Sequence, residues 1–244
     1  MKKTFVTIDP SVLPIGPDAP FRYRRFLPGE ERPGAGSPAA GTARRADDDA
    51  LARSIGRCGL LHPPLILAEP GDGPPAVVCG HRRVAAARIA GIESIEAISL
   101  AAPRTEAIAP WLEEARFGSP LSDLELVILM SKCRALSGDR FSDATEHIFR
   151  VAGRSLSPSY IDRALRLLEL PDDVLDALHD GRLSTGDLLA LSESEAIDPV
   201  LAARLIAGAE LKRAERREAV RLLLRLGDLG IRGDVEESSG EGGR

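Results

Sequence analysis

The chain has 244 residues, a net charge of −5 at pH 7, and 43% hydrophobic and 28% charged residues. This balance is typical of a globular protein with one large domain or two small ones, and it excludes a general polyanion binder of the histone kind. Three widely spaced cysteines exclude a paired zinc motif. No apolar run reaches membrane-spanning length and no signal-peptide core is present, so we expect a cytoplasmic protein without a membrane partner.

The first hundred residues have the pattern of a small mixed α/β unit. Residues 28–46 are rich in Pro, Gly and Ala without a period, so we expect a flexible loop there. Asp47–Gly59 has acids in its first turn and an apolar face, which predicts a helix. Short apolar, β-branched runs predict strands at 5–8, 65–67, 76–79 and 92–100.

The stretch around Gly80 carries the chemistry of this unit. The expected strand runs through Gly80 into an alanine-rich helix, and the first N–H groups of a helix attract anions. Arg82 and Arg83 lie in the first turn, and each guanidinium matches a phosphate bidentately. The pattern predicts a phosphate or nucleotide cradle. The alternative is that both arginines are solvated and Gly80 only makes the turn.

A basic and aromatic segment, Pro20–Phe26, precedes the expected loop. Such a segment can hold phosphates or lie over a nucleotide base, and a solvated loop is the alternative.

From about residue 105 the sequence is helical almost throughout. Ser122 and Glu125 have the spacing of a capping box. Thr105–Phe117 is a candidate helix that Pro110 breaks or caps. Further helices are expected from 122, over 142–152, 157–168, 171–178, 184–191 and 199–226, and residues 227–244 should be disordered.

Two of these helices, joined through Gly153, have a helix-turn-helix pattern. In the DNA-binding version, the N-terminal part of the second helix enters the major groove. The exposed candidates for that role are Ser157, Ser159, Tyr160, Asp162 and Arg163. An ordinary helical hairpin is the alternative.

Several motifs resemble the ParB family of chromosome and plasmid partition proteins. The family carries a Gly-Glu-Arg-Arg box, alanines and an Ala-Gly ending, and Gly80-His81-Arg82-Arg83 through Ala90-Gly91 is similar to it. The other resembling segments are Pro20–Phe26, Ser54-Ile55, Gly59–Pro63, Leu121–Glu125 and Leu165–Pro171. They follow the family order from about residue 5 to residue 192, and this ordered co-occurrence is more specific than any one motif.

The resemblance implies a bacterial α+β protein with a ParB/sulfiredoxin-like nucleotide-binding domain over 1–104 and a helical DNA-binding domain over 105–192. Helices over 193–226 and a disordered tail over 227–244 would follow. In the family, CTP with magnesium closes a dimeric clamp on DNA, which implies a homodimer and a partition ATPase as partners. The resemblance assigns the nucleotide to Gly80, His81, Arg82, Arg83 and Arg24. The helix-turn-helix pattern gives Ser157, Ser159, Tyr160 and Arg163 as the DNA-binding candidates.

Three departures from the family pattern are chemically specific. His81 stands in place of the family's Glu. The family's metal-binding Glu-Asn-x-Gln-Arg motif falls on Glu114–Gly118, so Glu114 remains as a metal and catalytic candidate while Ala115 cannot coordinate Mg²⁺. We therefore expect weak or absent CTP hydrolysis. The family's DNA-binding Gly-His-Ala-Arg falls on Gly186–Leu189, where Asp187 is expected to repel phosphate.

Two other functions remain open. One is a protein-interaction adaptor that keeps the fold without clamp chemistry. The other is an enzyme of the sulfiredoxin or serine-kinase type, because sulfiredoxins use a cysteine at the same turn. Here Cys79 comes one residue earlier, within the expected strand, which favours a buried core thiol.

Overall fold

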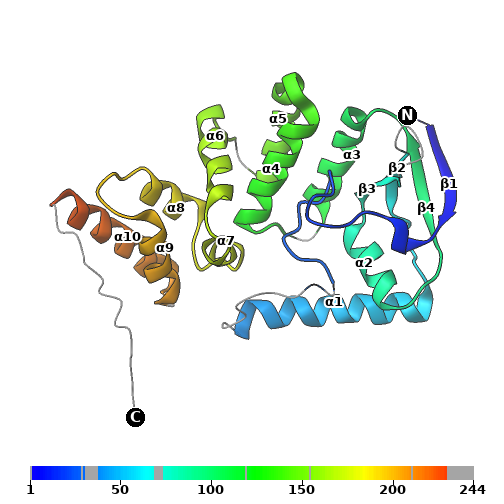
Figure 1. Ribbon diagram of the computed structural model, residues 1–244, viewed down its shortest axis with the longest axis horizontal. Helices are drawn as coiled ribbons and strands as arrows, with labels where there is room; N and C mark the ends of the chain where they lie inside the picture. The colour runs from blue at the N-terminus through cyan, green and yellow to red at the C-terminus, as the bar shows by residue number, and fades with distance from the viewer. Residues whose placement is uncertain are drawn as a thin grey trace, which may run out of the picture.

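The computed structural model describes residues 2–28, 30, 38–68, 74–118, 120–153, 155–209 and 211–229, with the backbone alone at 38–46 and at 143. It confirms the predicted α+β class. A small sheet lies at one end, and helices extend from it to the other (Figure 1).

The described residues form one four-stranded mixed sheet in the order β1-β4-β2-β3. β1 pairs with β4 in antiparallel register, β2 runs parallel to β4, and β2 and β3 form an antiparallel pair. The strands are β1 Lys2–Ile8, β2 Leu65–Leu67, β3 Ala76–Cys79 and β4 Ile95–Ala101. β3 is buried at all four positions, which matches its continuous apolar sequence.

Helices cover both faces of this sheet. Alternate strand residues point to opposite faces, so Ile66 and Val77 meet α2 (His81–Ile89) on one side, with α1 (Pro38–Cys58) packed against α2. On the other side Val78 meets α3 (Arg104–Phe117). The turn between β3 and α2 therefore lies between two helical layers.

α3 continues straight through Pro110, which the sequence predicts as a break or cap. The proline removes one helical hydrogen bond. However, Ile108 before it and Trp111 and Leu112 after it are all buried in one core cluster, and this packing keeps the helix intact.

Seven further helices among the described residues form the rest of the molecule. They are α4 Asp123–Ser137, α5 Phe141–Ala152, α6 Pro158–Arg166, α7 Asp172–His179, α8 Thr185–Ser192, α9 Pro199–Gly208 and α10 Arg213–Asp228. The capping box of Ser122 and Glu125 at α4 is present as predicted. Gly153 ends α5 with a φ of 67°, and Ser157 caps α6, so the two predicted helices and the glycine between them are present.

Two sequence predictions are wrong. α1 begins at Pro38, so residues 38–46 are helical and not loop, because the alanines and arginines there favour helix more strongly than the single Gly41 opposes it. Residues 31–37 of that loop lie outside the described residues. The expected helix over 199–226 is two helices, because the chain turns after Gly208 and α10 packs back on α8 and α9.

The tail predicted as disordered begins at residue 227, but Gly227 and Asp228 form the last residues of α10, so the prediction is also wrong there. From position 230 onward it lies outside the described residues. Within the described part of the chain, we find no helix with the length and apolar character needed to cross a membrane.

Candidate functional site

The turn from β3 into α2 is made by Gly80 in the left-handed region, with a φ of 94°. A Cβ at this position would lie 2.9 Å from Nη2 of Arg83, because the guanidinium of Arg83 lies over the glycine. Glycine is thus required both for the backbone conformation and for this close approach.

Arg83 is fixed in place by three neighbours. Its Nη1 donates to the carbonyls of His62 and Pro63 at 2.6 and 3.0 Å, and its Nη2 lies 3.2 Å from Oε1 of Glu114 on α3. The neutral carbonyls orient the guanidinium without cancelling its charge, so Glu114 is the acid that balances it.

Arg82 faces α1. Its Nε and Nη2 donate to Oδ1 of Asp48 at 3.2 and 2.7 Å, and Nη2 also lies 3.4 Å from Oδ2 of Asp47. Burial by itself would lower the pKa of Arg82, but the bonds to Asp48 and Asp47 outweigh it and raise the pKa. Arg82 is therefore a fixed cation whose counter-ions come from α1.

Arg24 reaches the same place from the N-terminal segment. Its Nη1 donates to Oε2 of the buried Glu125 at 3.0 Å and to the carbonyl of Pro120 at 3.2 Å, and its guanidinium lies over the ring of Tyr23. The segment containing Arg24 is thereby tied to the start of α4.

Gly80 and the three arginines Arg24, Arg82 and Arg83 line one cavity of about 260 Å³. It contains every residue that the sequence assigns to the nucleotide, together with Glu114. Tyr23 and Gly118 belong to segments that the sequence analysis singled out, Pro20–Phe26 and Glu114–Gly118. The sequence did not indicate Leu51, because only the fold brings α1 to the cavity. The lining residues are Tyr23, Arg24, Leu51, Gly80, His81, Arg82, Arg83, Glu114 and Gly118.

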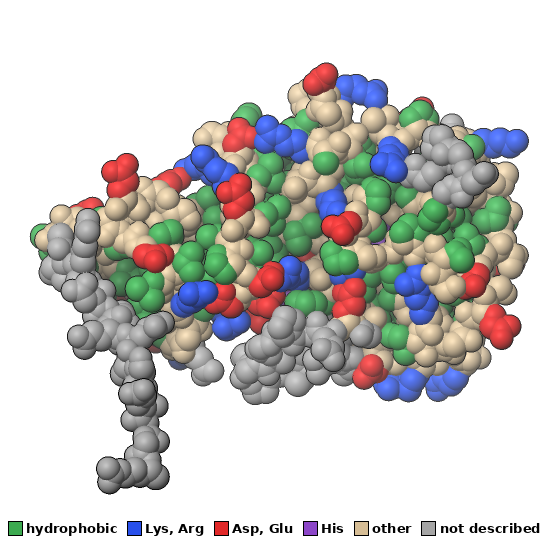
Figure 2. Space-filling model, in the orientation of Figure 1, with side chains coloured by type: hydrophobic (Ala, Val, Ile, Leu, Met, Phe, Trp, Pro, Cys, Tyr) green, Lys and Arg blue, Asp and Glu red, His purple; other side chains and the backbone are tan. Residues whose placement is uncertain are grey.

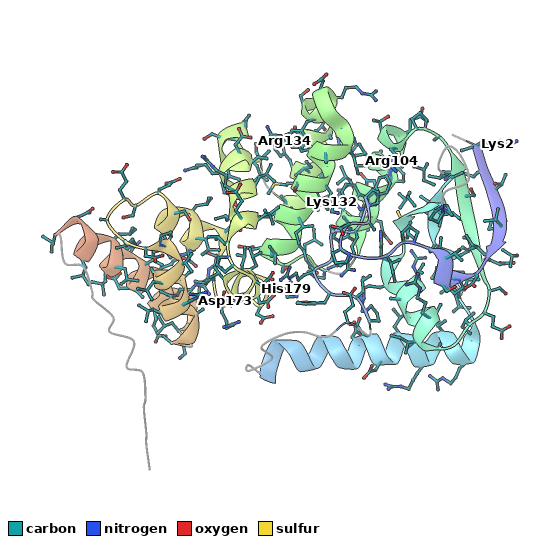
Figure 3. The ribbon with its side chains drawn as sticks, viewed as in Figure 1. Lys2, Arg104, Lys132, Arg134, Asp173 and His179 are labelled. Carbon is teal, nitrogen blue, oxygen red and sulfur yellow. The ribbon has the colours of Figure 1, made fainter. Side chains whose placement is uncertain are left out.

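His81 lines the cavity as an uncharged side chain. It is 6% exposed, and its Nε2 has no hydrogen-bond partner among the described residues. Burial, together with the positive charges of Arg22, Lys132 and Arg83, lowers its pKa to about 3. Lys132 points from α4 toward the N-terminal segment, where Nζ donates to the carbonyls of Pro17 and Ala19 (Figure 3).

The relatives that this sequence matches are partition proteins of the kind that its motifs resemble. A probable chromosome-partitioning protein ParB of Neisseria meningitidis is 31% identical over 181 residues, which cover 72% of this chain and 61% of the relative. The chromosome-partitioning protein ParB of Caulobacter vibrioides is 29% identical over 166 residues, which cover 68% of this chain and 52% of the relative. The chain is homologous to ParB partition proteins over most of its length. No family model matches the sequence.

The chain spans only 61% and 52% of these two ParB relatives. Two solved structures of C-terminally truncated ParB from Caulobacter crescentus are also similar, each at 24% identity. The structure with CTP-gamma-S gives a TM-score of 0.35 and covers 83% of this chain and 98% of the other. The structure with the centromeric parS site gives 0.43 and covers 89% and 97%.

The residues of this ParB relative do not form a magnesium site of their own. Ala115 of α3 is buried in the hydrophobic core, and Glu114 is the one carboxylate among the described residues that line the cavity. Glu114 is also paired with Arg83. Mg²⁺ needs octahedral oxygen ligands, so an ion here would depend on phosphate and water for the rest. No group of three or more His, Cys, Asp or Glu suited to a metal is found in the described part of the chain.

Cys79 does not have the surroundings of a nucleophile. Its thiol is buried in β3 and lies 3.6 Å from the carbonyl of Pro110. Burial, reinforced by the nearby Glu114, raises its pKa far above the ordinary value of 9.0, so the reactive thiolate is disfavoured. The burial of this thiol therefore disfavours the alternative of a sulfiredoxin-type enzyme with a cysteine nucleophile.

The candidate DNA-binding residues lie on α6 and at its N-cap. The two charged candidates, Asp162 and Arg163, already form ion pairs within the protein. Arg163 donates to Glu193, and Asp162 accepts from Arg134 of α4 at 2.6 Å. Figure 3 shows Arg134 directed from α4 toward α6. Acidic and basic side chains are interspersed on the face shown in Figure 2.

The three polar candidates at the start of α6 differ in accessibility. Ser157 accepts a hydrogen bond from the backbone N–H of Tyr160, so it acts as a cap. Ser159 is exposed, and the ring of Tyr160 packs against both neighbouring cores.

The predicted repulsion of phosphate by Asp187 is wrong. The Asp187 carboxylate points into the protein, accepts from the backbone and hydroxyl of Ser184, and lies 2.8 Å from Nε of Arg216 on α10. It is buried and neutralised. Asp187 is thus the N3 residue of a capping box, and its charge does not face a DNA surface.

Proposed function

We propose that the chain is a bacterial, cytoplasmic ParB-type partition protein, which binds CTP in the Gly80 cavity and DNA through α5 and α6. The observation that carries the nucleotide site is the convergence of three arginines and the start of α2 on one cavity. His81 also lines this cavity, and its buried Nε2 has no hydrogen-bond partner among the described residues.

Each cavity residue would have a separate task. The backbone N–H groups that follow Gly80 would face a phosphate at the positive end of α2. Arg82 and Arg83 would bind phosphate oxygens bidentately, and Arg24 would contact the ligand from the opposite wall. The neutral His81 would supply one hydrogen bond without adding charge. These tasks need no metal. Because Glu114 is the only carboxylate among the described lining residues, we propose binding with little or no CTP hydrolysis.

We assign nucleotide binding to the part of the chain that contains the sheet, and DNA binding to the helical part that follows it. We propose that residues 1–104 form the nucleotide domain and residues 105–192 the DNA-binding domain, with the helices over 193–226 packed against the latter. As a partition protein the chain would act as a homodimer and work with a partition ATPase, in line with its family.

Calorimetric titration with CTP tests the nucleotide site. The wild-type protein should bind CTP, and Arg82→Ala should weaken binding by about tenfold or more because charge-assisted hydrogen bonds to phosphate are lost. Arg57→Ala removes an exposed arginine from α1 outside the cavity lining and is the matched control. Absence of CTP binding, or equal binding by Arg82→Ala and Arg57→Ala, would contradict the proposal.

A protein-interaction adaptor is the second candidate. It is favoured by the ion pairs that already neutralise Arg163 and Arg134. A DNA titration at different salt concentrations distinguishes the two functions, because only a phosphate-binding protein loses affinity steeply with salt.

A further inference from the structure

α1 is packed against the sheet domain near its C-terminal end, and an earlier part of the helix reaches the cavity. Ala52 and Ile55 are buried against the α2 side of the sheet, and Gly56 lies close to Ala90 at the end of α2. Before this anchored part, Leu51 lines the cavity and Asp48 bonds Arg82. Figure 1 shows α1 running beneath α2 and extending past it. The part of α1 that precedes Leu51 therefore reaches a cavity-lining side chain, Arg82, through Asp48 and Asp47.

Asp48 uses the donors of Arg82 that a phosphate would use. Nε and Nη2 form one edge of the guanidinium, and both point at Oδ1 of Asp48. The carboxylate of Asp48 is 13% exposed and that of Asp47 is 72% exposed, so Asp48 is the acid held inside. An Arg edge that bonds a carboxylate cannot bond a phosphate at the same time.

We propose that Asp48, supported by Asp47, occupies Arg82 in the place of a phosphate, so that nucleotide binding displaces the N-terminal part of α1 from the cavity. This inference rests on the proposed nucleotide site and concerns its regulation. A bound triphosphate would take the edge of Arg82 and would repel both aspartates. Ala52 and Ile55 do not contact the phosphate position and would remain packed, so the movement is confined to the preceding turns.

The competition couples two equilibria. If docking of Asp48 opposes phosphate, phosphate must oppose docking of Asp48 by the same factor. Removing the charge of Asp48 should therefore both loosen α1 and tighten nucleotide binding. A purely structural role for Asp48 predicts loosening alone.

The test compares Asp48→Asn with Asp49→Asn in the full chain. Asp49 is exposed on the same helix, so its substitution removes the same charge away from Arg82. CTP affinity is measured by calorimetry, and hydrogen exchange is followed at the amides of α1. Asp48→Asn should bind CTP about tenfold more tightly than Asp49→Asn. In the wild-type protein CTP should speed exchange before Leu51 and leave the amides around Ile55 unchanged.

Two results would overturn the inference while leaving the nucleotide site intact. One is CTP binding by Asp48→Asn that is no tighter than that of Asp49→Asn. The other is slower exchange in α1 when CTP binds to the wild-type protein. If neither variant nor the wild-type protein binds CTP, the proposed nucleotide site itself is wrong. Circular dichroism of Asp48→Asn establishes that the variant is folded.

Discussion

The uncharged state of His81 has a consequence for stability. The folded protein keeps this ring neutral because it is buried beside Arg22, Lys132 and Arg83, and its pKa is about 3 in place of 6.5. The unfolded chain binds a proton below pH 6.5, and the folded chain does not. The free energy of unfolding therefore falls as the pH drops from 6.5 toward 3.

Replacing His81 with Gln should remove this pH dependence. At pH 5.5 the wild-type protein should have lost about 1 kcal/mol more stability, relative to pH 7.5, than His81→Gln. Urea unfolding of both proteins at the two pH values measures the difference, and the substitution cancels the contributions of carboxylates common to both. Equal losses would show that His81 takes up a proton in the folded protein.

At the residue scale, sequence reasoning found the cations of the cavity and missed their partners. Gly80, Arg82 and Arg83 are adjacent in the chain, so their pattern is local. The pairing of Arg82 with Asp48 and the burial of His81 depend on segments that are distant in the chain. An acidic run such as Asp47–Asp49 predicts a helix start, but it carries no signal for the side chain that it will meet.

Among the helices, α6 carries the charged residue whose substitution best tests DNA binding, Arg163. Arg163 is paired with Glu193, so a phosphate must compete with that carboxylate. Both side chains are partly exposed, and an exposed pair of this kind contributes at most about 1 kcal/mol. The pair therefore weakens a phosphate contact but does not prevent it.

Glu193→Gln should raise DNA affinity about fivefold at low salt because Arg163 becomes available. Arg163→Ala should lower it and reduce the slope of log affinity against log salt by about 1. Fluorescence anisotropy with a labelled duplex measures both, and Glu195→Gln, an exposed acid on the same turn, is the control. If the wild-type protein shows no salt-dependent binding, the adaptor function is favoured.

Elements with local signals were predicted, and elements decided by tertiary packing were not. The β3–Gly80–α2 turn and the α5–α6 pair have a glycine at a positive φ, and α6 also has a serine cap, all of which are visible in the sequence. The separate α10 depends on the buried pair of Arg216 with Asp187, two residues far apart in the chain. No local pattern marks such a pair.

At the scale of the whole molecule, the N-terminal segment joins the sheet to the helices. Phe21 packs edge-on against Trp111 of α3, with ring centroids 5.6 Å apart. Further along the segment, Arg25 bonds Asp172 and Asp176 of α7 at 2.6 and 3.2 Å. The N-terminal segment thus contacts both α3, which covers one face of the sheet, and α7, which follows α6 in the chain.

The core also continues across residue 104, the boundary that the sequence predicts between domains. Val78 and Leu100 of the sheet share a cluster with Trp111 and Leu112 of α3, and Ile148 of α5 belongs to the same cluster. The proposed nucleotide site and the proposed DNA site therefore border one continuous core, so we expect a change in the packing of α3 to affect both.

Residues 1–104 alone should therefore fail to unfold cooperatively. Without α3, the fragment loses the burial of Ile108, Trp111 and Leu112 against the sheet, at about 1.5–3 kcal/mol for each large side chain. This loss is comparable with the total stability of a small domain, about 5–15 kcal/mol. Thermal denaturation followed by circular dichroism measures cooperativity. Residues 1–118, which restore α3, are the matched fragment and should regain a transition, whereas a sharp transition for residues 1–104 would show that the sheet is stable without α3.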